Sequence, residues 1–129
     1  MISKTLNIGI ASVEDYQARA LAIVRGEYKP GKDEPKIWFS SIESLAQVLS
    51  TKNQLLLELI ARAKPSSITE LAELSGREQS NLSRTLKTMA QYGFVELKKG
   101  AGRELVIIAP YEQFKVQCKI FNYAGQASA

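Results

Sequence analysis

Residues 79–87 of the sequence carry amide, hydroxyl and basic side chains and no carboxylate. The amides of Gln and Asn can bond adenine in a bidentate manner, the guanidinium of Arg can fork onto guanine, and Ser can bond either base edge. A solvated helix usually mixes Glu with Lys, and this stretch does not. These residue types predict contact with DNA bases, and the candidate DNA-binding side chains are Gln79, Ser80, Asn81, Ser83, Arg84 and Lys87.

A second basic group follows in Lys98, Lys99 and Arg103, which surround two glycines. Flexible basic loops of this kind suit contact with phosphates or with the minor groove. The alternative is an ordinary hairpin tip that is basic for solubility. We expect Gln79, Asn81 and Arg84 to read bases. We expect phosphate contacts from Lys87, Lys98, Lys99 and Arg103.

The charge of the chain is concentrated in its middle. Residues 51–103 contain nine Lys or Arg against five Asp or Glu, which supplies the whole formal charge of +4. Residues 1–50 and 104–129 are each neutral overall. A basic middle between neutral ends suggests a polyanionic partner, although the same charge could form an ordinary solvated face.

The elements that must position these side chains follow from periodicity and caps. A helix from Thr51 ends before Pro65, a second opens at the S-x-x-E box of Ser67, and a third runs from about Glu78 to Tyr92. Gly76 permits the left-handed turn between the last two. Strands at 94–98 and 104–109 then form a hairpin. The order helix, helix, turn, helix, hairpin predicts a winged helix-turn-helix.

The ends of the chain predict additional elements. Alternation predicts strands at 4–10, 37–39 and 113–120, and Ser12 opens a helix that ends near Gly26. A further helix is capped by Ser41. The predicted fold class is α+β, mainly α. The predicted domains are an N-terminal strand-helix-strand extension (1–40), the winged helix-turn-helix (41–110), and a C-terminal strand and tail (111–129).

Each predicted helix has an apolar face that we expect to point inward. In chain order these faces consist of Val13, Tyr16, Ala20 and Ile23; Ile42, Leu45, Ala46 and Leu49; Leu55, Leu56, Leu59, Ile60 and Ala63; Ile68, Leu71, Ala72 and Leu74; and Leu82, Leu86 and Met89. Because Leu82, Leu86 and Met89 share one side of their helix, the polar candidates fall on or near the opposite side. We also expect Trp38 and Phe39 in a core or subunit interface, and Cys118 as a buried thiol.

Several other functions are excluded. The chain has no histidine and one cysteine, so it lacks a thiolate or imidazole metal site and a Ser-His or Cys-His pair. Residues 26–33 differ at one position from the phosphate-binding motif G-x-x-x-x-G-K-[ST], because Asp33 replaces the hydroxyl residue that would bind magnesium. Pro35 also blocks the helix that should follow such a loop. We therefore predict no enzyme activity, no metal and no cofactor. With no membrane-spanning run and no long signal-peptide core, we expect a cytoplasmic protein without membrane contact.

Residues 36–97 resemble predicted archaeal and bacterial transcriptional regulators of the MarR-like winged-helix group, most specifically through GREQSNLSRTLKTMAQYGFVEL. The resemblance implies a winged-helix fold, a homodimer and operator binding, and so a repressor that regulates transcription. Members of the group often lie beside a small toxin gene and are described as antitoxins, so an antitoxin role with a cognate toxin partner is a further implication.

A different class of function also stays open, namely a winged-helix module whose main role is to bind a partner protein. The alternating segments 4–10 and 113–120 could act as edge strands that pair with another chain. They could equally pair with each other or across a dimer.

Overall fold

The computed structural model describes residues 4–102 and 104–119, and the chain divides into two compact units. The first unit combines residues 1–45 with residues 113–129, and the second spans residues 46–112. Over the described residues the fold is α+β and mainly helical, with five helices, five strands and about 46% of the residues in helices. The predicted α+β, mainly α class is confirmed.

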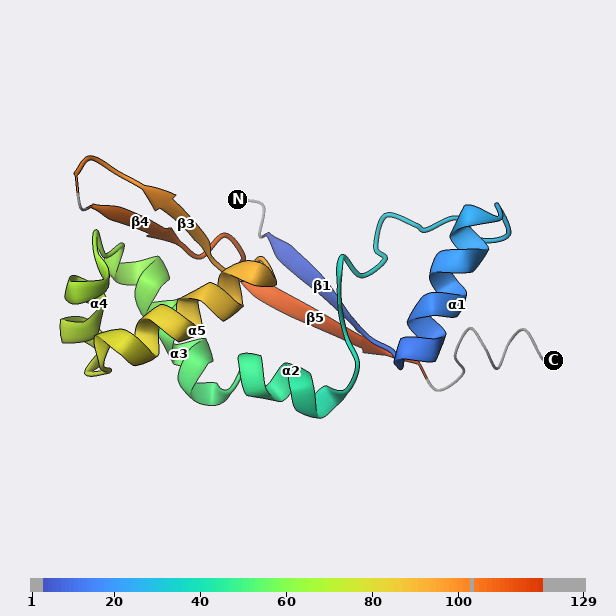
Figure 1. Cartoon of the computed structure of the whole chain (residues 1–129), viewed down its shortest axis with the longest axis horizontal. Coiled ribbons are helices and arrows are strands. Elements are labelled where there is room, and N and C mark those ends of the chain that lie inside the picture. The colour runs from blue at the N-terminus through green and yellow to red at the C-terminus, as the bar shows by residue number, and fades with distance from the viewer. Residues whose placement is uncertain (1–3, 103, 120–129) are drawn as a thin grey trace. The chain divides into compact units, whose positions relative to one another are not determined.

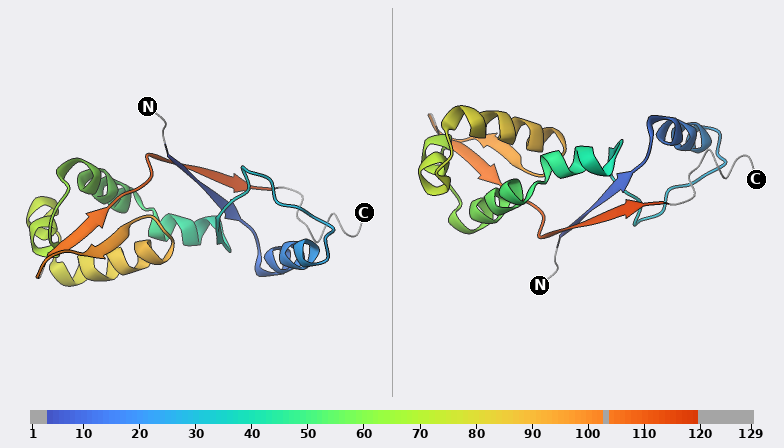
Figure 2. Two further views of the ribbon diagram at one scale, coloured as in Figure 1. Left: turned by 90° about the horizontal axis from the view of Figure 1, so that it is seen from above. Right: turned by 90° about the horizontal axis from the view of Figure 1, so that it is seen from below.

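The first unit is built on a three-stranded parallel sheet in the order β2-β1-β5, accompanied by one helix. The arrows of β1 and β5 lie side by side and point the same way (Figures 1 and 2). The elements are β1 (Thr5–Ile10), α1 (Val13–Val24), β2 (Ile37–Phe39) and β5 (Gln113–Cys118).

The connection from β1 through α1 to β2 is a crossover, which parallel neighbours require. Ser12 begins α1 as predicted, because its Oγ accepts a 3.1 Å hydrogen bond from the backbone N–H of Asp15. The chain turns away after α1 at Gly26, where φ is +75°. These local signals account for the predicted strand-helix-strand order.

The third strand comes from the other end of the chain. β5 pairs with β1 from Thr5 opposite Gln113 to Ile10 opposite Cys118. The two terminal strands therefore pair with each other, which is one of the alternatives that the sequence left open. β1 is the central strand, so the edges of the sheet are β2 and β5. The last predicted position of this strand, Ile120, lies outside the described residues.

Trp38 is fixed closely against the sheet. It lies beside Gly9 in the register, and a Cβ added to Gly9 would come within 2.4 Å of the indole ring. The ring also meets Tyr16 edge-on, with 6.0 Å between centroids, and the guanidinium of Arg19 lies 4.9 Å from its centroid. Phe39, predicted to be in a core or interface, is buried. A glycine is thus needed for the indole to lie flat on β1.

The second unit carries three helices and a hairpin. Its elements are α3 (Thr51–Ala63), α4 (Ile68–Ser75), α5 (Gln79–Gln91), β3 (Glu96–Lys99) and β4 (Leu105–Ile108), preceded by α2 (Ile42–Val48), which begins in the first unit. Ser50 and Ser67 cap α3 and α4 by accepting hydrogen bonds from the third residue of each helix. The C-cap residue of α3 is Lys64, which has a left-handed backbone conformation and directly precedes Pro65. The predicted helices and strands are confirmed to within two residues at their ends.

The core of the second unit consists of Leu56, Leu57, Ile60, Leu71, Leu82, Leu86, Met89, Phe94, Val95 and Ile107. The antiparallel hairpin of β3 and β4 contacts the rest of the second unit in two ways. Ile107 of β4 is buried, and the backbone N–H of Leu105 donates a 2.9 Å hydrogen bond to the carbonyl of Ser66, just before α4. The hairpin is thereby held against the segment between α3 and α4.

Some predicted inward faces are wrong. The exposed members are Val13, Tyr16, Ala20, Ile42, Ala46, Leu55, Ala63 and Leu74. In α3 the buried side chains are Leu56, Leu57 and Ile60, so the inward face is rotated away from Leu55. The cause is that apolar residues extend around more than one side of these helices, and tertiary packing selects the side that is covered.

The prediction for Cys118 is also wrong, because its thiol is exposed. Val116, on the same face of β5, is 51% exposed. β5 lies at the edge of the sheet and has a neighbouring strand on one side only. Alternation therefore predicted a buried face that the described part of β5 does not have, since only Phe114 on that face is half-buried.

We expect Gly9→Ala to lower the free energy of unfolding by about 1–3 kcal/mol, because the new methyl group must displace the indole of Trp38. Urea unfolding followed by the fluorescence of Trp38, the single tryptophan in the sequence, measures this change. Gly31→Ala is the matched control, since its added Cβ meets nothing within 4 Å. Equal stability of the two variants would contradict the close packing described here.

Candidate nucleic-acid interface

The turn between α4 and α5 sets the direction in which α5 leaves. Gly76 ends α4 in the left-handed region, with φ of +72°, and its N–H donates to the carbonyl of Ala72 at 2.9 Å. Arg77 and Glu78 follow, with Glu78 in an extended conformation, and α5 begins at Gln79. Glu78 forms no side-chain cap, so the amino end of α5 has no side-chain acceptor from its N-cap residue.

α5 separates its side chains into two sides as the sequence predicts. Leu82, Leu86 and Met89 are each at most 1% exposed. The exposed candidates on this helix are Gln79, Ser80, Arg84 and Lys87, and the half-buried ones are Asn81 and Ser83. The exposed side of the first half of α5 thus presents amide, hydroxyl and basic groups without a carboxylate. Such a surface can donate and accept hydrogen bonds at base edges and attract phosphates.

Arg77 is a residue that the sequence reasoning missed, and it organises the start of α5. Its Nε donates to Oδ1 of Asn81 at 2.9 Å, one terminal nitrogen donates to Oδ1 of Asn53 at 3.0 Å, and the other donates to Oγ1 of Thr85 at 3.1 Å. Asn53 in turn donates from Nδ2 to the carbonyl of Val48 at 3.0 Å. The planar guanidinium therefore connects α3 to one side of α5.

This network bears on how Asn81 can act. Bidentate reading of adenine uses both the amide oxygen and the amide nitrogen. In this structure Oδ1 of Asn81 accepts from Arg77, which leaves Nδ2 to face a ligand. Gln79 is less constrained, since its amide is exposed and its Nε2 donates to Oγ1 of Thr69 at 3.2 Å. Arg84 is exposed, and its guanidinium has no hydrogen bond or ion pair among the described residues.

The hairpin brings a second basic surface to the same unit. Lys98 and Lys99 are exposed at the end of β3, and Lys98 Nζ lies 3.9 Å from the carboxylate of Glu96. An exposed pair at that distance contributes little, so Lys98 can exchange Glu96 for a phosphate. The predicted contact Arg103 lies outside the described residues. Of the three hairpin residues that the sequence predicts to contact DNA, the described residues therefore include two.

Residues 4–102 and 104–119 contain no group of three or more Cys, Asp or Glu side chains arranged to hold a metal ion. In the same residues, no helix has both the length and the apolar character needed to cross a bilayer.

We expect Arg77→Lys to lower the free energy of unfolding by about 1–3 kcal/mol, because an ammonium group cannot reproduce the planar fork that reaches Asn53, Asn81 and Thr85. Urea denaturation followed by helical circular dichroism measures the loss. Arg62→Lys is the control, since Arg62 is an exposed arginine paired only with Glu58 in the same helix at 2.8 Å. A loss for Arg77→Lys no larger than that for Arg62→Lys would show that the network adds nothing to stability.

Comparison with known proteins relates part of the chain to a protein family. No curated protein and no solved structure matches the chain. The model of the HVO_A0114 family matches residues 48–116, from the end of α2 through the hairpin and into β5. The matched segment is 69 of the 129 residues and contains all of α3, α4, α5, β3 and β4. The protein belongs to the HVO_A0114 family.

Proposed function

We propose that this protein is a sequence-specific transcriptional regulator that binds double-stranded DNA and inserts α5 into the major groove. The observation that carries the proposal is the exposed, carboxylate-free side of α5 opposite Leu82, Leu86 and Met89. An α-helix fits the major groove, where each base pair presents a distinct pattern of donors and acceptors. Gln79, Ser80 and Arg84 carry matching groups at the amino-terminal half of the helix, where recognition helices contact bases.

The second unit supports this proposal as a winged helix-turn-helix. In this interpretation α4 and α5 are joined by a short turn with glycine at the left-handed position, and β3 and β4 form the wing. The hydrogen bond from Leu105 to Ser66 holds the wing to the segment before α4. A wing fixed in this way can place its basic end against the backbone beside the groove that α5 occupies.

Electrostatics favour a polyanion at this unit. The whole formal charge of +4 comes from residues 51–103. The amino end of a helix carries a partial positive charge, and the amino end of α5 has neither an acidic first turn nor a side-chain cap from Glu78. A DNA phosphate can accept from these backbone N–H groups, while Lys87, Lys98 and Lys99 neutralise neighbouring phosphates.

We further propose that the protein acts as a homodimeric repressor, in keeping with the MarR-like resemblance. Two copies related by a twofold axis would place two α5 helices in successive major grooves. The operator is then a near-palindrome with half-sites about 34–36 Å apart. An antitoxin role, with a toxin as partner, would be compatible with the same operator binding.

The alternative, a module whose main role is to bind a partner protein, has less support in the first unit than the sequence suggested. Strand addition needs a free edge, and β1 is the central strand of its sheet. β5 keeps one free edge, so this alternative now depends on β5 or β2 alone.

We expect Arg84→Ala to weaken binding to the operator by about 1–3 kcal/mol, or roughly 5- to 150-fold in Kd, and to relax specificity at one base position. The operator is first selected from random duplex DNA, and Kd is then measured by fluorescence anisotropy. Arg62→Ala removes the same charge from an exposed site on α3 and is expected to change Kd little. If both variants bind like the unmodified protein, α5 does not read the groove through Arg84.

We expect the double variant Lys98→Ala, Lys99→Ala to bind all DNA sequences more weakly and to reduce the slope of log K against log salt by about two units. The slope is measured between about 50 and 200 mM salt on the operator and on an unrelated duplex. Lys52→Ala with Arg62→Ala, which also removes two positive charges from the second unit, is the matched control. An unchanged slope would place the hairpin away from the phosphates.

A further inference from the structure

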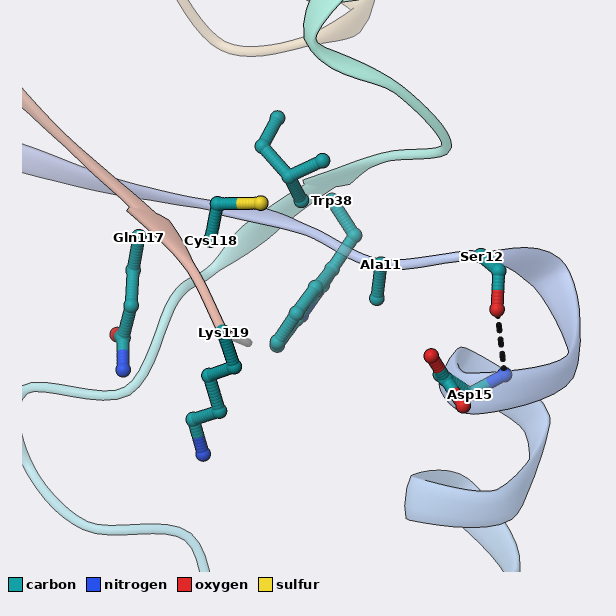
Figure 3. A pocket seen from close by; sticks show the side chains of 8 residues that line it. Ala11, Ser12, Asp15, Trp38, Gln117, Cys118 and Lys119 are labelled. Carbon is teal, nitrogen blue, oxygen red and sulfur yellow. Dashed lines mark hydrogen bonds between the residues drawn. The ribbon is translucent and has the colours of Figure 1, made fainter. Parts of the chain in front are cut away.

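A cavity of about 140 Å³ lies in the first unit, where β1 and β5 end and α1 begins. Residues of all these elements and of β2 line it, including Ala11, Asp15, Trp38, Gln117 and Cys118 (Figure 3). In open parallel sheets, ligands bind outside the carboxyl ends of the strands. The cavity lies at the carboxyl ends of β1 and β5, whose last residues line it.

Asp15 gives this cavity a chemical character. It is the one buried charged residue in the described chain, with 6% of its surface exposed. The hydrogen bond recorded for Asp15 is made by its backbone N–H to Ser12, and its carboxylate has no hydrogen bond or ion pair among the described residues. Figure 3 shows the carboxylate directed into the space lined by Trp38 and the end of β5. The carboxylate oxygens are not among the buried side-chain atoms that lack a partner, so they meet solvent in the cavity, where a bound cation could replace water as their partner.

The natural internal partner for Asp15 is engaged elsewhere. Arg19 is four residues further along α1, the spacing at which opposite charges usually pair on a helix. Its guanidinium instead lies over Trp38, at 4.9 Å from the ring centroid, and reaches the carboxylate of Glu34 at 3.5 Å. Glu34 is itself bonded by the hydroxyl of Tyr28. These contacts use a terminal nitrogen of Arg19, its Nε is buried without a hydrogen-bond partner, and no ion pair joins Arg19 to Asp15 among the described residues.

The other residues that line the cavity determine what kind of molecule could carry the positive charge to Asp15. The indole of Trp38 lies against Gly9 and has the guanidinium of Arg19 over it, so its contribution to the cavity is an apolar wall and not a free site for positive charge. Lys119 also lines the cavity but is exposed, so solvent screens its charge. A volume of 140 Å³ is close to that of a cavity of about 150 Å³ that holds benzene.

We propose that this cavity binds a small organic ammonium, with its charged nitrogen donating to the carboxylate of Asp15 and its short apolar body packed against Trp38. The proposal goes beyond DNA binding and does not depend on it, because every residue invoked belongs to the first unit. Variants of α5 such as Arg84→Ala should bind the ammonium like the unmodified protein.

The sequence supplies two reporters for the test, since Trp38 is the single tryptophan and Cys118 the single cysteine. The full chain is titrated with benzylamine in phosphate buffer, and the emission of Trp38 and the rate of alkylation of Cys118 by iodoacetamide are followed. We expect a saturable change in emission and a slower alkylation at the same benzylamine concentrations. Benzyl alcohol, which has the same shape without the charge, should bind about tenfold more weakly, as expected for the loss of one charge-assisted hydrogen bond.

Asp15→Asn is expected to weaken benzylamine binding by about tenfold for the same reason. Glu14→Gln is the matched control, because it removes a carboxylate from the same turn of α1 at an exposed position. Circular dichroism establishes whether each variant is folded, and the comparison of benzylamine with benzyl alcohol needs no variant. The proposal is overturned if benzylamine leaves both reporters unchanged, if benzyl alcohol binds equally well, or if a folded Asp15→Asn protein binds benzylamine as well as Glu14→Gln does.

Discussion

The burial of one side of α5 is the constraint on which the second unit depends. Leu82, Leu86 and Met89 occupy the core together with Leu71 and Phe94, and all five are at most 1% exposed. Since a helix is rigid over this length, burying these positions also fixes which side chains face outward. The polar side of α5 is therefore a consequence of how the core is packed. Its residue types can vary without any change in the packing of the core.

The parts of the fold and of the candidate site that the sequence predicts are those governed by near neighbours. The caps at Ser12 and Ser67 and the turn at Gly76 each involve atoms within a few residues, so their patterns are visible in the sequence. The contact of Arg77 with Asn53 joins positions 24 apart, and no local pattern marks it. The same guanidinium bonds Oδ1 of Asn81 and so decides which atoms of that amide remain available. The composition of the site was therefore predictable and its internal bonding was not.

The inward faces of helices with broad apolar content show the same limit. α3 has leucines on more than one side, and only packing with the other elements distinguishes Leu57, which is buried, from Leu55, which is 61% exposed. In α1 the buried position is an acidic one, Asp15, which an apolar-inward rule assigns to the surface. Departures of this kind are expected where a residue serves a purpose other than core packing.

The parallel pairing of β1 with β5 has a consequence for the order in which the chain folds. The hydrogen bond from Gln113 to Thr5 spans 108 positions, while residues 46–112 form a continuous unit between the two strands. The second unit is continuous in sequence and can fold first, whereas the pairing of β1 with β5 must close a loop that contains the whole of that unit. Until that loop closes, β1 has no neighbour on one edge, and an open strand edge of this kind is prone to aggregation.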